Sequence, residues 1–178
     1  MKPNYLKTYY TTLSINRFVP VFRDFPETIF IILDSFHYLV KNKKIQIYAF
    51  VIMKDHLHII WETNKENEIE EIITSFKKHT GKKIIDYLKS FNNNNYHENF
   101  MSIRKDRNYK IWKQPKGNLK IKGKKILINK IKYIHNNPIK GDYKSVNDII
   151  DYYFSSAFAY SMELSNFAFL TVLKNIVP

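Results

Sequence analysis

The sequence contains no cysteine, so neither disulfide bonds nor zinc sites with thiolate ligands are available to it. It also has no apolar run near twenty residues and no stretch with the pattern of a signal peptide. We therefore expect a cytoplasmic protein that does not enter a membrane. No repeat or linker divides the 178 residues, and the 44% hydrophobic content is enough for one globular domain with its own core.

Acidic residues are few: 16 Asp and Glu stand against 29 Lys and Arg, which gives a formal net charge of +13. Such an excess favours a polyanionic partner, and nucleic acid before a membrane surface. A merely soluble basic surface is the alternative. Because lysine, asparagine and isoleucine are abundant throughout, the position of a lysine is more informative than its presence.

One stretch predicts a β-hairpin. Ile45 to Met53 and His56 to Glu62 are rich in β-branched and aromatic residues, and only Lys54-Asp55 lies between them. Side chains alternate across a strand, so His56 and His58 point to one face, while Leu57, Ile59 and Trp61 point to the other. Two converging imidazoles indicate a candidate metal site, although two polar residues on a half-solvated face would give the same pattern.

The flanking segments predict further elements. We expect a strand over Tyr9 to Ile15, then a helix that starts near Pro26 and buries a stripe ending at Val40. After the hairpin, Asn64 is a candidate cap for a second helix with its own apolar stripe. Ile111 to Lys113 is a candidate short fourth strand.

A later helix carries the second half of the candidate site. It is predicted over Ile126 to Asn136, because Pro138 disfavours helical geometry just before it. Lys130, Tyr133 and Asn137 recur at i, i+3 and i+7, so an ammonium, a hydroxyl and an amide share one stripe. In a chain with thirteen tyrosines, Tyr133 alone reads first as an ordinary aromatic at a helix edge.

Several lysines are candidates for phosphate contacts. One group lies on the exposed side of the second helix, another in the basic loop before the third helix, and one on the tyrosine stripe. The set is Lys77, Lys78, Lys82, Lys83, Lys116, Lys120, Lys122 and Lys130. Plain solvent exposure explains each of them equally well.

Three motifs in this order resemble those of the single-tyrosine HUH transposases, closest to the REP-associated tyrosine transposase branch. They are Met53 to Ile60 with its His-Leu-His, the Trp112 segment, and Tyr133 to Pro138 followed by Ser155-Ser156. The resemblance runs from about Tyr9 to Tyr160. This sequence departs from it with Lys54-Asp55 in place of the commoner Pro-Asn, and with a long, asparagine-rich region before Trp112.

The resemblance implies a ferredoxin-like α+β sandwich, in which an antiparallel sheet carries packed helices. It implies that His56 and His58 bind a divalent metal, Mg²⁺ or Mn²⁺, with Asn137 as third ligand. Glu62 is the next candidate for that ligand. Tyr133 would be the nucleophile that cleaves and rejoins single-stranded or hairpin DNA through a 5′-phosphotyrosine, with electrostatic help from Lys130.

The same resemblance divides the chain into a catalytic domain over residues 1–160 and a tail over residues 161–178, packed on the domain or on a partner. A homodimer fits too, since some members build each active site from two protomers. Two other readings stay open: a non-catalytic module that binds single-stranded nucleic acid on this fold, and a metal-dependent hydrolase that uses activated water. Intact histidines, tyrosine and asparagine speak against the binding module.

Overall fold

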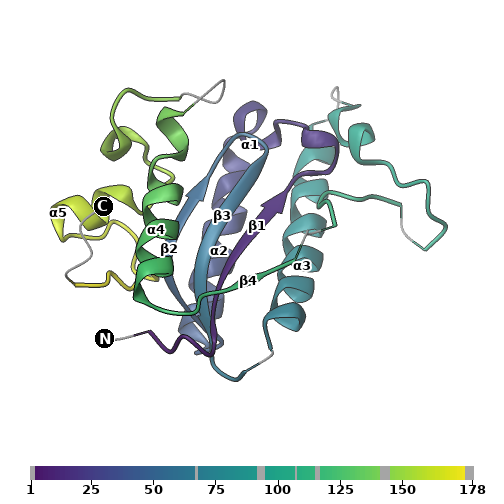
Figure 1. Cartoon of the computed structure of the whole chain (residues 1–178). Helices are drawn as coiled ribbons and strands as arrows, with labels where there is room; N and C mark the ends of the chain where they lie inside the picture. The colour runs from purple at the N-terminus through teal and green to yellow at the C-terminus, as the bar shows by residue number, and fades with distance from the viewer. Residues whose placement is uncertain are drawn as a thin grey trace.

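The computed structural model describes residues 3–66, 68–91, 95–106, 108–114, 117–140 and 145–174. A four-stranded sheet in the order β2-β3-β1-β4 forms its centre, and every strand pair is antiparallel. The strands are β1 (Thr8–Ser14), β2 (Ile45–Ile52), β3 (His56–Thr63) and β4 (Leu119–Lys120). The α-helices are α1 (Val21–Asp24), α2 (Glu27–Lys41), α3 (Ile69–Lys89), α4 (Lys124–His135) and α5 (Ala157–Met162). The predicted α+β fold is confirmed (Figure 1).

The predicted hairpin is present as β2 and β3. Ile52 pairs with Leu57, and the Met53 amide donates to the His56 carbonyl at 2.8 Å, which closes the turn over Lys54-Asp55. A register shift between Ile47 and Ala49 interrupts an otherwise regular ladder. On its other side β3 pairs with β1, where Thr12 lies opposite His58 and Ser14 opposite His56.

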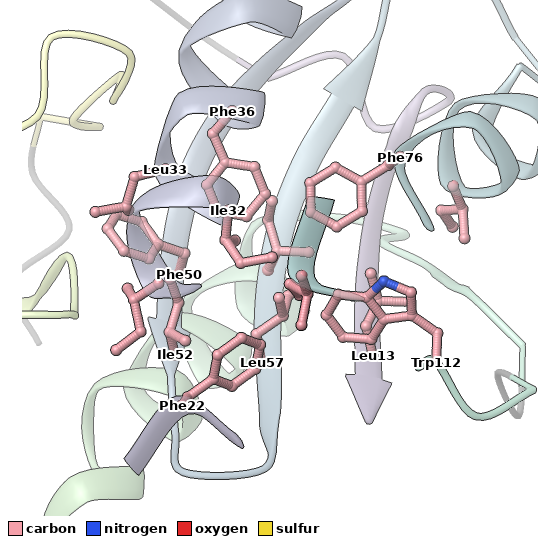
Figure 2. Packing of buried hydrophobic residues seen from close by; sticks show 14 of the residues in the cluster. Leu13, Phe22, Ile32, Leu33, Phe36, Phe50, Ile52, Leu57, Phe76 and Trp112 are labelled. Carbon is pink, nitrogen blue, oxygen red and sulfur yellow. The ribbon is translucent and has the colours of Figure 1, made fainter. Parts of the chain in front are cut away.

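The two faces of the sheet are covered by different helices. Leu57, Ile59 and Trp61 point to the face covered by α2 and α3, where they join the larger hydrophobic core. Figure 2 shows side chains from α2, α3 and the strands meeting there. The opposite face packs against α4, and its smaller core includes Ile60 and Ile131. In Figure 1, α4 stands at the left, in front of β2, and α2 lies behind the strands.

Two predicted element positions are wrong. The fourth strand is β4 rather than Ile111 to Lys113. That segment makes an isolated bridge, from Trp112 to Ile15, and the Trp112 indole turns into the core, where it donates to the Thr80 hydroxyl at 2.9 Å. Asn64 does not cap a helix. Its amide donates to the Lys44 carbonyl at 3.2 Å, which ties Asn64 to the end of the sheet, and α3 starts only at Ile69.

The remaining elements are close to the prediction. The structure has α2 starting directly after Pro26, and α4 starting and ending close to the expected residues. Between β1 and α2 the chain forms a 3-10 turn (Asn16–Phe18) and the short helix α1.

Segments near the C-terminus cover the outer edge of β2. The Ile52 amide donates to the Phe154 carbonyl at 2.9 Å, and the Thr171 amide donates to the Ile47 carbonyl at 2.8 Å. An edge strand otherwise exposes unpaired backbone groups, so these bonds satisfy it. Within the residues described, no helix combines the length and apolar character needed to span a membrane.

Candidate active site

His56 and His58 lie side by side on the face of β3 that turns toward α4. Their ring centroids are 5.0 Å apart at an interplanar angle of 76°. The alternation of the strand places them there, while Leu57 between them is buried in the opposite core. The site therefore occupies the end of the sheet beside the β2–β3 turn.

His58 is held by two hydroxyl groups of β1. Its Nδ1 lies 2.8 Å from the Tyr10 Oη and 2.8 Å from the Thr12 Oγ1. Burial, followed by the nearby His56 and Lys130 charges, lowers the pKa of His58 to about 3. The ring is thus neutral at physiological pH, which is the form that binds a metal. Binding through Nε2 requires the tautomer in which Nδ1 carries the proton and donates to these oxygens.

His56 is held by a carboxylate. Its Nδ1 lies 2.6 Å from Oδ1 of Asp55, the residue before it, and Asp55 is only 2% exposed. The sequence had shown Asp55 only as a departure from the family motif, and it had shown Tyr10 and Thr12 only as alternate residues of a strand. All three side chains contact one of the two histidines. What they share in the sequence is a polar side chain at a position that can face the histidine pair.

Tyr133 faces the histidines from α4. Its ring centroid lies 5.4 Å from that of His58 and 6.2 Å from that of Tyr10, both in edge-on geometry. The side of α4 that carries Ile131 and Ile134 is buried, which leaves Tyr133 at the margin with 44% of its surface exposed. One chain thus brings together the strand histidines and the helix tyrosine.

Lys130 lies one turn before Tyr133, on the stripe expected from the sequence. Its Nζ is 4.4 Å from the Tyr10 ring centroid and 5.4 Å from the Tyr133 ring centroid. An ammonium at this distance favours negative charge at the tyrosine side of the site.

Asn137 follows the end of α4, where a 3-10 turn (Asn137–Ile139) begins. Its amide nitrogen donates to the Tyr133 carbonyl at 3.1 Å, so the side chain remains fixed to the tyrosine turn. Glu62 fits less well as a ligand. Its Oε2 already accepts from the Tyr48 hydroxyl at 2.7 Å and from the Asn4 backbone amide at 2.8 Å. Glu62 also lies four residues from His58, which is about 13 Å along a strand.

No group of three His, Cys, Asp or Glu side chains forms a metal site within the described ranges. A divalent ion on the two imidazoles would need a further donor of another kind, such as an amide oxygen or water.

Most of the candidate phosphate-binding lysines lie away from the histidines. Because α3 packs on the opposite face of the sheet from α4, its lysines face another part of the surface. Lys77, Lys78 and Lys82 line a hollow of about 680 Å³ together with Tyr109 and Trp112.

Several of these lysines already have partners. Lys77 donates to the Lys113 carbonyl at 2.9 Å, and Lys82 pairs with Asp86 at 2.6 Å. On β4, Lys120 pairs with Glu66 at 2.8 Å, and this hydrogen bond raises the pKa of Lys120. Lys78, Lys83 and Lys122 are exposed, and Lys116 lies outside the described residues.

A buried network fixes α4 to the edge strand. His135 Nε2 lies 2.8 Å from Ser156 Oγ, which accepts from the Phe50 amide at 3.0 Å and lies 3.2 Å from the Phe50 carbonyl. Burial lowers the pKa of His135 to about 4. His135, two residues after Tyr133, thus contacts Ser156, the second serine of the downstream pair. The sequence had not predicted this contact.

Fold and site together define an α+β protein in which a strand histidine pair faces a helix tyrosine. The chain belongs to the family of IS200-like transposases, whose model matches residues 27–137. The family resemblance seen in the sequence is therefore confirmed.

The fold is similar to that of a solved protein described as a REP-associated tyrosine transposase bound to a REP hairpin. The TM-score is 0.59 at 16% sequence identity, and the match covers 97% of each chain. A comparison with curated proteins gave no match.

Proposed function

We propose that this protein is a metal-dependent transposase that cleaves and rejoins single-stranded DNA through a 5′-phosphotyrosine on Tyr133. The observation that carries the proposal is the 5.4 Å separation of the Tyr133 and His58 rings, formed by elements distant in sequence. Membership of a transposase family supports it.

In the proposed reaction the Tyr133 oxygen attacks the scissile phosphorus. A bond forms between that oxygen and phosphorus, the bond from phosphorus to the 3′-oxygen breaks, and the leaving oxygen takes a proton to become a 3′-hydroxyl. The phenol proton passes to solvent water during attack, and Lys130, whose Nζ is 5.4 Å from the ring, stabilises the charge that develops on the oxygen. The link conserves the phosphodiester energy, so a 3′-hydroxyl can later displace Tyr133 and rejoin DNA without ATP.

His56, His58 and Asn137 are the residues we propose to hold Mg²⁺ or Mn²⁺. When bound, the ion would supply Lewis-acid polarisation of the scissile phosphate. The chemistry of the donors fits: His58 is neutral because burial lowers its pKa, and each histidine has its Nδ1 engaged by an oxygen. Two imidazoles suit manganese better than magnesium, which prefers oxygen ligands.

We propose single-stranded or hairpin DNA as the partner. The net charge of +13 favours a polyanion, and the solved relative was bound to a hairpin. The Lys130 Nζ lies 5.4 Å from the ring of the proposed nucleophile, whereas Lys78, Lys83 and Lys122 are exposed for contacts with more distant phosphates. A cytoplasmic location, a homodimer and the division at residue 160 stay predictions.

The test is a covalent trapping assay with Tyr133→Phe. Single-stranded DNA is labelled at its 3′ end in one sample and at its 5′ end in another, incubated with Mn²⁺ and separated under denaturing conditions. A 5′-phosphotyrosine retains the 3′ label on the protein and releases the 5′ label with a free 3′-hydroxyl. We expect Tyr133→Phe to lose the adduct and to bind DNA as the parent does in EDTA. Tyr153→Phe, which changes a tyrosine that is 58% exposed, is the matched control.

Other outcomes select the other readings. Cleavage without any adduct would indicate a hydrolase that uses water, and binding without cleavage would indicate a non-catalytic module. An adduct that persists in Tyr133→Phe would move the nucleophile to another residue.

A further inference from the structure

We infer that Asp55 is a positioning residue that holds the His56 imidazole in the orientation and tautomer needed to bind the metal. The inference rests on the proposed function, because it concerns the proposed metal site. Its basis is the 2.6 Å contact between Asp55 Oδ1 and His56 Nδ1, made by a carboxylate that is 2% exposed. An acid this deeply buried needs a partner, and His56 supplies it.

The backbone around Asp55 is fixed from both sides. The Ile15 amide donates to the Asp55 carbonyl at 2.8 Å, and the Phe22 amide donates to the Lys54 carbonyl at 3.1 Å. The Met53 amide closes the turn on the His56 carbonyl. These bonds join the turn to the end of β1 and to the start of α1, so the backbone that carries the Asp55 side chain is held beside His56.

The consequence for His56 follows from the chemistry of imidazole. When Nδ1 carries a proton and donates it to the carboxylate, Nε2 presents the lone pair that binds an ion. The negative charge of Asp55 also makes the ring a stronger electron donor. His58 differs, because the partners of its Nδ1 among the described residues are the neutral hydroxyls of Tyr10 and Thr12. The two histidines should therefore contribute unequally, and the Asp55–His56 unit should be the more sensitive to substitution.

A purely structural salt bridge is the competing interpretation, and metal affinity distinguishes the two. Mn²⁺ affinity is measured by calorimetry for the parent, Asp55→Ala and Asp55→Asn, with thermal unfolding as the check on folding. Asp86→Asn is the matched control, since Asp86 is an exposed acid paired with Lys82 on α3. Single-strand DNA binding in EDTA gives a readout that does not involve the metal.

We expect Asp55→Ala to weaken Mn²⁺ binding about 10–100-fold, the usual cost of losing such a partner. Asp55→Asn should lose less, because an amide oxygen can still accept from Nδ1 without the charge. Asp86→Asn should bind as the parent does, and DNA binding in EDTA should not change in any variant.

Mn²⁺ affinity within twofold of the parent in a folded Asp55→Ala would overturn the inference alone. If Asp55→Ala fails to fold, the same result in Asp55→Asn decides against it. A parent protein that binds no Mn²⁺ overturns the metal site itself and this inference with it.

Discussion

Replacing Ser156 with alanine tests how α4 is held on the sheet. The Ser156 hydroxyl is fully buried and lies within hydrogen-bond distance of the Phe50 amide, the Phe50 carbonyl and His135 Nε2. The geometry is satisfied when His135 donates to the hydroxyl, the Phe50 amide donates to it as well, and the hydroxyl donates to the Phe50 carbonyl. Alanine removes all three interactions at one position.

The expected loss of stability comes from the buried polar groups that Ser156→Ala leaves without a hydrogen-bond partner. The Phe50 carbonyl retains the bond from the Ser156 amide at 3.0 Å, so it is not left unpaired. The Phe50 amide and His135 Nε2 each lose a partner in a buried environment, and each such loss costs about 1–3 kcal/mol. We therefore expect Ser156→Ala to lower the free energy of unfolding by roughly 2–6 kcal/mol, a large share of the stability of a domain this size.

The assay is urea unfolding at pH 7, followed by circular dichroism. Ser155→Ala is the matched control: Ser155 is also buried, but among the described residues its hydroxyl accepts a single bond, from the Ala157 amide at 3.1 Å, so one such loss, about 1–3 kcal/mol, is expected. The double variant His135→Leu/Ser156→Ala should be more stable than the sum of the single changes predicts, because it leaves no unpaired imidazole. Equal losses in Ser155→Ala and Ser156→Ala, or strict additivity, would refute this account of the network.

Three further predictions follow from the site. Burial lowers the pKa of His135 from 6.5 to about 4 on folding, so the native state binds fewer protons than the unfolded state. About 3 kcal/mol of the free energy of unfolding should therefore be lost as the pH drops from 7 to 4. His135→Leu should flatten the dependence on pH of the stability measured by urea unfolding. In cleavage assays, excess Mn²⁺ should rescue Asn137→Ala but not His58→Ala, since water can replace an amide oxygen more readily than a buried imidazole; equal rescue would argue against Asn137 as a ligand. Replacing the exposed Lys78, Lys83 and Lys122 with alanine should lower the salt dependence of single-strand binding by about two units of slope, and Lys41→Ala, in the last turn of α2, should leave it unchanged.

The fold could be predicted where the periodicity was strong. The β2–β3 hairpin alternates over many residues and is joined by only two, so neither pairing nor direction was ambiguous. The fourth strand was misplaced because β4 has only two residues, too few to show a pattern. Ile111-Trp112-Lys113 had the stronger strand composition, but the large Trp112 side chain is used in the core.

The candidate site divides in the same way. Which residues share a face of β3 or a stripe of α4 depends on local geometry, so sequence spacing could group His56 with His58, and Lys130 with Tyr133. That the two pairs belong to one site was implied by the family resemblance, not by spacing. Their supports depend on register between distant segments: Thr12 reaches His58 only because β1 pairs with β3 at that position. A single sequence contains no signal for such a register. Asp55 is adjacent to His56, yet its role depends on the turn that buries its side chain.

The charge was the least localised of the sequence signals, and the sheet explains why. A net charge of +13 indicates a polyanion, but α3 and α4 carry their lysines on opposite faces of one covered sheet. Lys130 beside Tyr133 and Lys78 in the hollow on the α3 side therefore cannot contact the same phosphate. Under the proposed function, lysines near Tyr133 would affect the chemical step, whereas those on α3 would affect how a longer DNA is held. The net charge counts the lysines of both faces together, and only the packing of the helices shows which lysine lies on which face.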